Sequence, residues 1–347
     1  MKAFSYTFML LGMTAVFASG VNMQPFSPAA TRKAFLNLID RPRVPLAPEL
    51  SKREGSVGGE HWHFSFAADA EQRVPGILVK ASNFSGRRPV VISLHGTGGT
   101  KESQLDLLNE LASLGFIGVA IDGRYHGERI KAGKGAVEYN QAMLRTYRTG
   151  KEHPFLYDTV WDVMRLLDYL LTRPDVDANR IALIGFSKGG METYLTAAVD
   201  ARVAAAVPFI GVQSFRWALE HDSWQSRVGT FQDAIQRAAK DEGEAEIKAD
   251  FVYRFYQRVM PGIADEFDGP QMVPLIAPRP LLVINGDTDP RTPMPGLMDC
   301  IEKTRAAYKE AKAEGNFEVK IQSKTGHAVT PEARKLAISW LQKWLHP

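Results

Sequence analysis

The sequence predicts an α/β protein in which a mostly parallel, doubly wound sheet carries a helical cap insertion. Short apolar segments alternate with amphipathic helical segments from about residue 89 to residue 345 of the 347-residue chain. Such alternation is typical of a parallel sheet that is covered by helices on both faces. The alternation stops between about residues 211 and 270, where helical runs occur without a strong strand. We therefore expect this stretch to be an inserted cap.

The individual elements follow from apolar runs that have the length of strands buried on both faces. We expect such strands at residues 89–95, 116–121, 181–184, 203–210, 280–285 and 317–322. Helices are expected at residues 101–114, 158–171, 188–199, 294–313 and 330–345. Residues 61–66 and 74–80 are expected to pair as edge strands, and the polar segment 130–157 to form a surface excursion. Because ligands bind beyond the carboxyl ends of the strands in such sheets, the loops there are the candidates for function.

The N-terminal 60 residues are expected to lie outside the catalytic domain. Residues 1–20 have the pattern of a secretory signal peptide, with Lys2, an apolar or small-residue run, and a small-residue cleavage site at residues 18–20. The alternative is an uncleaved N-terminal anchor, and with either one we expect export to a secreted or periplasmic location. Residues 21–60 contain five prolines and are expected to form an irregular lead. Residues 61–347 form the expected catalytic domain, with its cap at about 211–270.

The composition argues against several classes of partner. The 42 Lys and Arg residues and 39 Asp and Glu residues give a net charge of +3 and form no basic patch, so we expect no nucleic acid. The single cysteine, Cys300, excludes an internal disulfide and is expected to pack in a helix. His61 and His63 would share one face of a strand, but no further His or Cys nearby completes a metal site. We therefore expect no metal, no cofactor, and no membrane span in the mature chain.

Ser187 is the strongest candidate for a nucleophile. It lies in Gly185-Phe186-Ser187-Lys188-Gly189, between a short apolar strand and a helix. A serine held in such a sharp turn needs neighbours without side chains, which the G-x-S-x-G spacing provides. The N-terminus of the following helix would favour a negative charge that develops beside the serine.

A serine hydroxyl needs a base, and the base needs an orienting carboxylate. In hydrolases built on such a sheet the chain order is serine, acid, histidine. His327 is then the candidate base, because His346 is the penultimate residue and is expected to be exposed. The acid lies in the loop after residues 280–285, where Asp289 is preferred. Asp287 is the alternative, and we expect it instead to hold backbone N–H groups of the turn.

Two backbone N–H groups are expected to form an oxyanion hole, those of Thr97 and Lys188. Thr97 belongs to a glycine-rich loop that lacks the spacing of either common nucleotide-binding motif. The Lys188 side chain is expected at the surface. Asp122 and His126, in the loop after residues 116–121, are expected to hold that loop in place rather than to touch substrate.

Together these motifs resemble the α/β-hydrolase superfamily, and most of all the branch of dienelactone hydrolases, acetyl xylan esterases and prolyl-oligopeptidase-type domains. The resemblance covers roughly residues 60–345 and rests on residues 94–99, 122–127, 185–190, 276–280, 286–289 and 326–327. It implies a Ser187–His327–Asp289 triad that hydrolyses an ester or a related acyl bond. Dienelactone hydrolases use a cysteine where this chain has Ser187, which favours an esterase over a lactone specialist.

The function expected from the sequence is therefore that of an exported serine hydrolase that cleaves a carboxylic ester of a small molecule or a saccharide. Trp217 and Trp224 of the cap are candidates for substrate binding, with burial inside the cap as the alternative. One rival function is that of a prolyl-oligopeptidase-type peptidase, but its usual propeller has no room in the first 60 residues. The other is a non-catalytic binding protein on the same fold, against which an intact triad argues.

Overall fold

A nine-stranded sheet organises the part of the chain that the computed structural model describes, residues 27–54, 59–82, 86–131, 136–152 and 156–347. The strand order is β1-β2-β3-β5-β4-β6-β7-β8-β9. The strands are β1 (Glu49–Lys52), β2 (Glu60–Ala67), β3 (Arg73–Lys80), β4 (Arg88–Leu94), β5 (Ile117–Ile121), β6 (Val176–Phe186), β7 (Val203–Phe209), β8 (Leu281–Gly286) and β9 (Phe317–Gln322). Neighbours from β5 to β9 pair in parallel, whereas β1, β2, β3 and β5 pair antiparallel. The predicted mostly parallel α/β sheet is confirmed.

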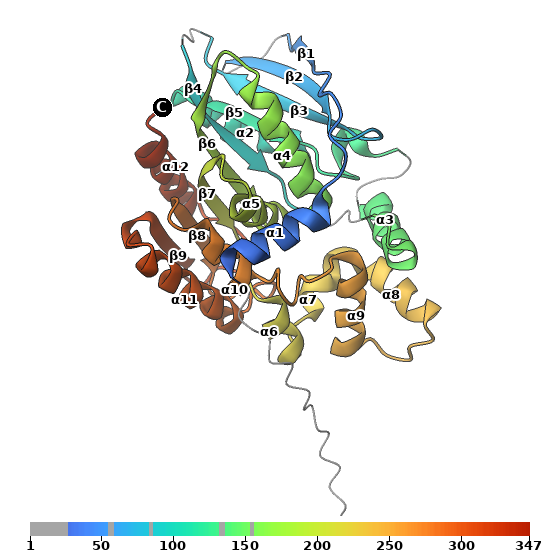
Figure 1. Ribbon diagram of the computed structural model, residues 1–347. Helices are drawn as coiled ribbons and strands as arrows, with labels where there is room; N and C mark the ends of the chain where they lie inside the picture. The colour runs from blue at the N-terminus through green and yellow to red at the C-terminus, as the bar shows by residue number, and fades with distance from the viewer. Residues whose placement is uncertain (1–26, 55–58, 83–85, 132–135, 153–155) are drawn as a thin grey trace, which may run out of the picture.

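Helices cover both faces of this sheet (Figure 1). The helices of these two layers are α1 (Pro28–Ile39), α2 (Leu105–Ser113), α4 (Tyr157–Leu171), α5 (Lys188–Val199), α11 (Met294–Glu310) and α12 (Pro331–Leu345). Side chains of β4 alternate between two separate cores, with Ile92 in the core shared with α1, α4, α5 and α11, and Val91 in the core shared with α2 and α12. This period of two explains why the strands read as continuous apolar runs.

The predicted cap is helical in the structure. It contains α6 (Phe215–Glu220), α7 (Gln225–Val228), α8 (Gln232–Asp241) and α9 (Ala249–Val259). Helix α3 (Ala136–Thr149) packs against α8 and α9 and buries Tyr139 and Met143 completely. The expectation of a polar surface excursion at residues 130–157 was therefore wrong for α3, because one side of this helix is apolar and is covered by the cap. The remaining short helices are α10 (Gly269–Met272), η1 (Lys101–Gln104), η2 (Gly127–Arg129), η3 (Gly229–Phe231), η4 (Val273–Ile276) and η5 (Glu314–Asn316).

The N-terminal lead is more regular than the sequence suggested. Ser27 caps α1 by accepting a hydrogen bond from the backbone N–H of Ala30, and Pro28 occupies the first helical turn, where it is tolerated. Phe35 of this helix is fully buried in the core. Strand β1 adds to the outer side of β2, so the expected edge pair is itself covered. The expectation of an irregular segment at 21–60 was wrong here, because Pro42, Pro45 and Pro48 follow α1 instead of interrupting it.

The proposed signal peptide, residues 1–20, lies outside the described residues. Among the residues that the structure does describe, none of the helices is both long and apolar enough to cross a bilayer.

Candidate active site

Ser187 lies at the tip of the turn between β6 and α5, with a strained backbone. Its φ of +56° and ψ of −111° lie outside the regions that residues with a side chain normally adopt. The turn is tight because the strand and helix approach each other closely. A Cβ at Gly185 would collide with the Gly189 carbonyl, and a Cβ at Gly189 would collide with the Leu94 carbonyl. The spacing of glycines around the serine is therefore a packing requirement of this turn.

The structure brings Ser187, His327 and Asp289 together from three different loops. The Nε2 atom of His327 lies 2.8 Å from Ser187 Oγ. Its Nδ1 atom lies 2.7 Å from Asp289 Oδ2. Asp289 is buried, whereas the serine and histidine are partly exposed. Burial raises the pKa of Asp289, but the hydrogen bond and charge of His327, together with hydrogen bonds from Arg291 and Thr292, lower that pKa overall. The buried acid is thus kept as a carboxylate that orients the ring.

The other acid candidate, Asp287, holds the loop that carries the histidine. Its carboxylate accepts hydrogen bonds from the backbone N–H groups of Lys324, at 2.9 Å, and Thr325, at 3.0 Å. These two bonds tie the loop after β9 to the loop after β8. The two aspartates therefore have different roles. Asp289 contacts the imidazole ring of His327, whereas Asp287 holds the loop that carries this histidine.

The loop after β4 runs beside the serine. A Cβ at Gly96 would lie 3.6 Å from the Ser187 Cβ, so the Gly96–Thr97 peptide is adjacent to the nucleophile. Lys188 is the first residue of α5, and its backbone N–H therefore has no intrahelical acceptor. The two expected oxyanion donors, on Thr97 and Lys188, thus belong to segments that lie next to Ser187.

Comparisons with known proteins identify the family of the chain. Residues 36–245, more than half of the chain, match the family model described as acetyl xylan esterase (AXE1). The chain belongs to the acetyl xylan esterase family. It is 30% identical over 290 residues to "Putative hydrolase YtaP" of Bacillus subtilis (strain 168), which covers 80% of this chain and 85% of that protein. As a member of this family it is a carboxylic-ester hydrolase.

Solved structures share its fold at lower identity. Acetyl xylan esterase 1 from Thermoanaerobacterium sp. JW/SL YS485 superimposes with a TM-score of 0.66 and 18% identity, over 92% of this chain and 95% of that chain. An acetyl xylan esterase from Paenibacillus sp. R4 gives a TM-score of 0.62 and 21% identity, over 90% and 92% of the two chains. These likenesses concern the α/β-hydrolase fold, on which the present site is built.

Beneath the nucleophile, this member of the acetyl xylan esterase family has a layer of buried ionisable side chains. Lys188 is 2% exposed, and its Nζ lies 2.6 Å from Oε1 of Glu192, one helical turn further along α5. The expectation of a surface position for the Lys188 side chain was therefore wrong, since the side chain turns inward to a carboxylate on the same helix. Burial, followed by the nearby Lys188 charge, lowers the pKa of His95 well below its usual value and that of His126 to about 3. Both imidazoles are therefore neutral at pH 7.

The loop after β5 is held by its own polar residues. The carboxylate of Asp122 accepts hydrogen bonds from the backbone N–H of Lys101, from its Nζ and from the backbone N–H of Glu128. His126 Nδ1 contacts the Arg124 carbonyl at 2.8 Å. Asp122 and His126 therefore occupy positions from which they stabilise the loop.

The two tryptophans proposed for substrate binding lie in different surroundings. Trp224 is buried in the core, and its Nε1 donates to Asp222 at 2.9 Å. Trp217 stacks on His221 and lines a cavity of about 240 Å³ between α6 and α11. None of the triad residues lines that cavity. For both tryptophans, packing within the cap is therefore better supported than direct binding of substrate.

Sequence reasoning missed Arg227, which joins the cap to the acid loop. Its guanidinium is buried and donates to the Arg291 carbonyl at 2.6 Å and to Gln213 Oε1 at 3.0 Å. The neighbouring Ser226 donates to the Pro290 carbonyl. These bonds hold the two residues that follow Asp289 on the loop after β8. A lone arginine in a helical segment gives no sequence signal for such a role.

Proposed function

We propose that this enzyme hydrolyses the carboxylic ester of a small molecule or saccharide through a Ser187–His327–Asp289 acyl-enzyme mechanism, and that it does so after export. The single observation that supports the mechanism best is the continuous contact of serine, imidazole and carboxylate at 2.8 and 2.7 Å. The family membership supports the ester as the substrate class. Export rests on the signal-like pattern of residues 1–20.

The first half of the reaction forms the acyl-enzyme. Ser187 Oγ attacks the ester carbonyl carbon while His327 Nε2 takes its proton. Asp289 accepts the Nδ1–H hydrogen bond and stabilises the imidazolium that forms. The Thr97 and Lys188 N–H groups bind the oxyanion, which pre-oriented dipoles stabilise more in the transition state than in the substrate. The tetrahedral intermediate then collapses, and the leaving alcohol takes the proton back from His327.

The second half clears the acyl group. A water molecule gives one proton to His327 and attacks the acyl carbonyl, and a second tetrahedral intermediate forms in the same oxyanion hole. Its collapse returns the proton to Ser187 and releases the carboxylic acid. Every proton transfer in this scheme uses one partly exposed histidine.

Active-site labelling tests the mechanism directly. We expect a fluorophosphonate probe to label the folded wild-type protein and to leave Ser187→Ala unlabelled, with the same circular dichroism spectrum for both proteins. Hydrolysis of aryl esters of increasing acyl length would then report the preferred acyl group. Labelling that persists in Ser187→Ala, or no labelling of folded wild-type protein, would contradict the mechanism.

Sequencing the N-terminus of protein recovered from outside the cytoplasm tests export, and cleavage near residue 20 is the expected result.

A further inference from the structure

Strand β9 forms one end of the sheet and pairs with a strand on one side only, where β8 runs parallel to it (Figure 1). The carbonyl of Gln322 accepts a hydrogen bond from the N–H of Asp287, the residue that follows β8, at 3.0 Å. Successive residues of a strand direct their backbone groups to opposite sides, so the even-numbered residues of β9 bond to β8. The N–H and C=O groups of Phe317, Val319 and Ile321 therefore point away from the sheet.

Most of these outward backbone groups are unpaired. The N–H of Phe317 donates to the carbonyl of Glu314 in the turn before the strand. Within the described part of the chain, the backbone groups of Val319 and Ile321 on this side have no hydrogen-bond partner. An open edge of this kind is a template on which another strand can pair.

The side chains of β9 form one apolar face and one charged face. Phe317, Val319 and Ile321 pack against the core and stay partly exposed. Glu318 and Lys320 are exposed on the other face. Neither of these two side chains forms an ion pair with another residue that the structure describes. Both charges are therefore available to a partner.

The charges of this segment are arranged with opposite signs on the two sides of Val319. Glu318 precedes this valine and Lys320 follows it, while Glu314 and Lys324 lie five residues to either side. A second copy of β9 that runs antiparallel, with its Val319 opposite this one, places each glutamate of the strand opposite a lysine. Opposite charges directly across a pair of strands stabilise that pair. The segment is thus complementary to itself.

The same register matches the apolar face and the backbone. It places Phe317 of one copy opposite Ile321 of the other, with the two Val319 side chains between them. Val319 exchanges two backbone hydrogen bonds with its copy, and the Ile321 N–H of each copy donates to the Phe317 carbonyl of the other. Moving the axis by one residue places Glu318 opposite Glu318, or Lys320 opposite Lys320, which is unfavourable.

The other end of the sheet is less suited to a partner. Strand β1 has only four residues. Its charges are already paired within the molecule, because Lys52 contacts Glu60 at 2.8 Å and Glu49 contacts Arg73 at 3.2 Å. The comparison favours β9 as the edge that binds another strand.

We propose that β9 binds the β9 strand of a second copy of this chain, antiparallel and centred on Val319, so that the two nine-stranded sheets join into one continuous sheet. The contact uses the same residues on both copies, as the interface of a two-fold symmetric dimer requires. The inference is independent of the proposed mechanism, because none of its residues belongs to the triad.

Charge reversal tests the interface without touching the core. The variants are Glu318→Lys, Lys320→Glu and the double variant that carries both changes, each as full-length protein. Sedimentation velocity at micromolar concentrations measures the dissociation constant of the dimer. Leu50→Lys on β1 is the matched control, because Leu50 is 46% exposed on the opposite edge of the sheet.

We expect the wild type and Leu50→Lys to be dimers. Each single reversal should raise the dissociation constant by about tenfold or more, because symmetry repeats the contact between like charges. The double variant should return to within about threefold of the wild type, since every pair is again of opposite sign. A mixture of the two single variants should form a heterodimer, in which the lysines of one protein lie opposite the glutamates of the other.

A disulfide tests the register. The Cα atoms of a hydrogen-bonded antiparallel pair lie about 5.5 Å apart, a distance that a disulfide spans. Val319→Cys is therefore expected to link to its copy under mild oxidation, whereas Ile321→Cys, which lies opposite Phe317, should stay unlinked. The native Cys300 is buried and does not interfere.

Three results would each overturn the proposal. The first is a monomeric wild type at these concentrations, and the second is a dimer that both single reversals leave unchanged. The third is a loss of dimer in the single variants that neither the double variant nor the mixture restores. Disulfide linkage in Ile321→Cys but not in Val319→Cys would contradict the register centred on Val319.

Discussion

His95 Nδ1 lies 2.8 Å from the carbonyl oxygen of Gly96 and fixes the peptide that joins Gly96 to Thr97. The backbone N–H of Gly123 donates to the other ring nitrogen, Nε2, at 3.0 Å. The proton of this neutral imidazole therefore lies on Nδ1, and it is donated to Gly96. Because the C=O and N–H of a trans peptide point in opposite directions, holding the Gly96 carbonyl aims the Thr97 N–H the other way.

Two replacements of His95 separate its two hydrogen bonds. His95→Asn keeps a donor at the position of Nδ1, whereas His95→Gln keeps an acceptor at the position of Nε2. If the bond to Gly96 positions the oxyanion donor, His95→Gln should lower kcat on an aryl acetate by on the order of 10²-fold, with little change in KM. His95→Asn should retain most of kcat. Thermal unfolding of both variants is the control, and the opposite order of kcat values would show that the bond to Gly123 matters more.

The two aspartates of the acid loop should respond differently to replacement by asparagine. Asp289→Asn removes the charge that orients His327, and kcat is expected to fall by about 10³- to 10⁴-fold. Asp287→Asn keeps one acceptor for the two backbone N–H groups that Asp287 holds, so kcat should fall by less than about tenfold while Tm decreases. Steady-state kinetics and calorimetry on both proteins check this. A larger kcat loss in Asp287→Asn would transfer the role of catalytic acid to that residue.

The sequence predicts those features of the structure that are determined by residues close to one another along the chain. The strands and the turn around Ser187 were readable because apolar runs and glycine spacing are determined by close packing within a few residues. Helix α1 lies among prolines, which predict irregular backbone, although the Ser27-Pro28 pair is itself a helix start signal. The cap was recognised as helical, but its contact with α3 has no sequence signature, since it joins segments about 100 residues apart.

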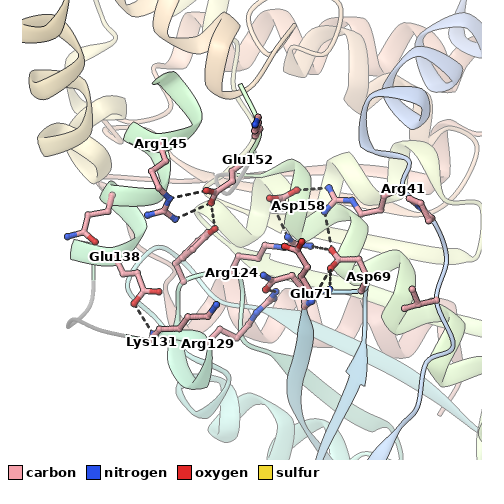
Figure 2. A pocket seen from close by; sticks show the side chains of 17 residues that line it. Arg41, Asp69, Glu71, Arg124, Arg129, Lys131, Glu138, Arg145, Glu152 and Asp158 are labelled. Carbon is pink, nitrogen blue, oxygen red and sulfur yellow. Dashed lines mark hydrogen bonds and ion pairs between the residues drawn. The ribbon is translucent and has the colours of Figure 1, made fainter. Parts of the chain in front are cut away.

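The polar network was the part least accessible to sequence reasoning. Ion pairs join Arg41, Asp69, Arg124 and Asp158, which come from four separate segments and meet only in the folded chain (Figure 2). One local feature of the sequence is consistent with the buried position of the Lys188 side chain, namely the glutamate four residues later. Such lysine–glutamate pairs are, however, usually exposed on helix surfaces. Burial, which decides the difference, is a property of the tertiary structure.

Glu192 should make stability depend on pH. Burial raises its pKa to about 7, against the opposing influence of Lys188, while Asp162 adds to the increase. Burial, followed by the nearby charge of Glu192, raises the pKa of Tyr139 of α3. Between about pH 4.5 and 7 the folded protein therefore holds a proton that the unfolded chain releases. The corresponding stability is present below that window and is lost as the pH rises through it, by up to about 3 kcal/mol.

The measurement is the free energy of unfolding by urea for the wild type and for Glu192→Gln at several values between pH 4.5 and 8. The glutamine stays neutral, so the stability of the wild type relative to this variant should decline as the pH rises across the window. His126 does not titrate there, because its pKa is lowered to about 3, and burial also lowers the pKa of His95 well below its usual value. A pH-independent difference between the two proteins would show that Glu192 is ionised throughout.

Replacing the nucleophile by glycine should stabilise the fold more than replacing it by alanine. At φ +56° and ψ −111° a Cβ is strained, whereas glycine adopts this conformation freely. Both variants lose hydrolysis, but Ser187→Gly should be more stable than Ser187→Ala by about 1–2 kcal/mol in urea unfolding. The matched pair is Ser113→Gly and Ser113→Ala at the last residue of helix α2, where the glycine variant should be less stable by up to about 1 kcal/mol. The same order at both positions would mean that the backbone at Ser187 is relaxed, and that the tight turn holds the nucleophile without strain.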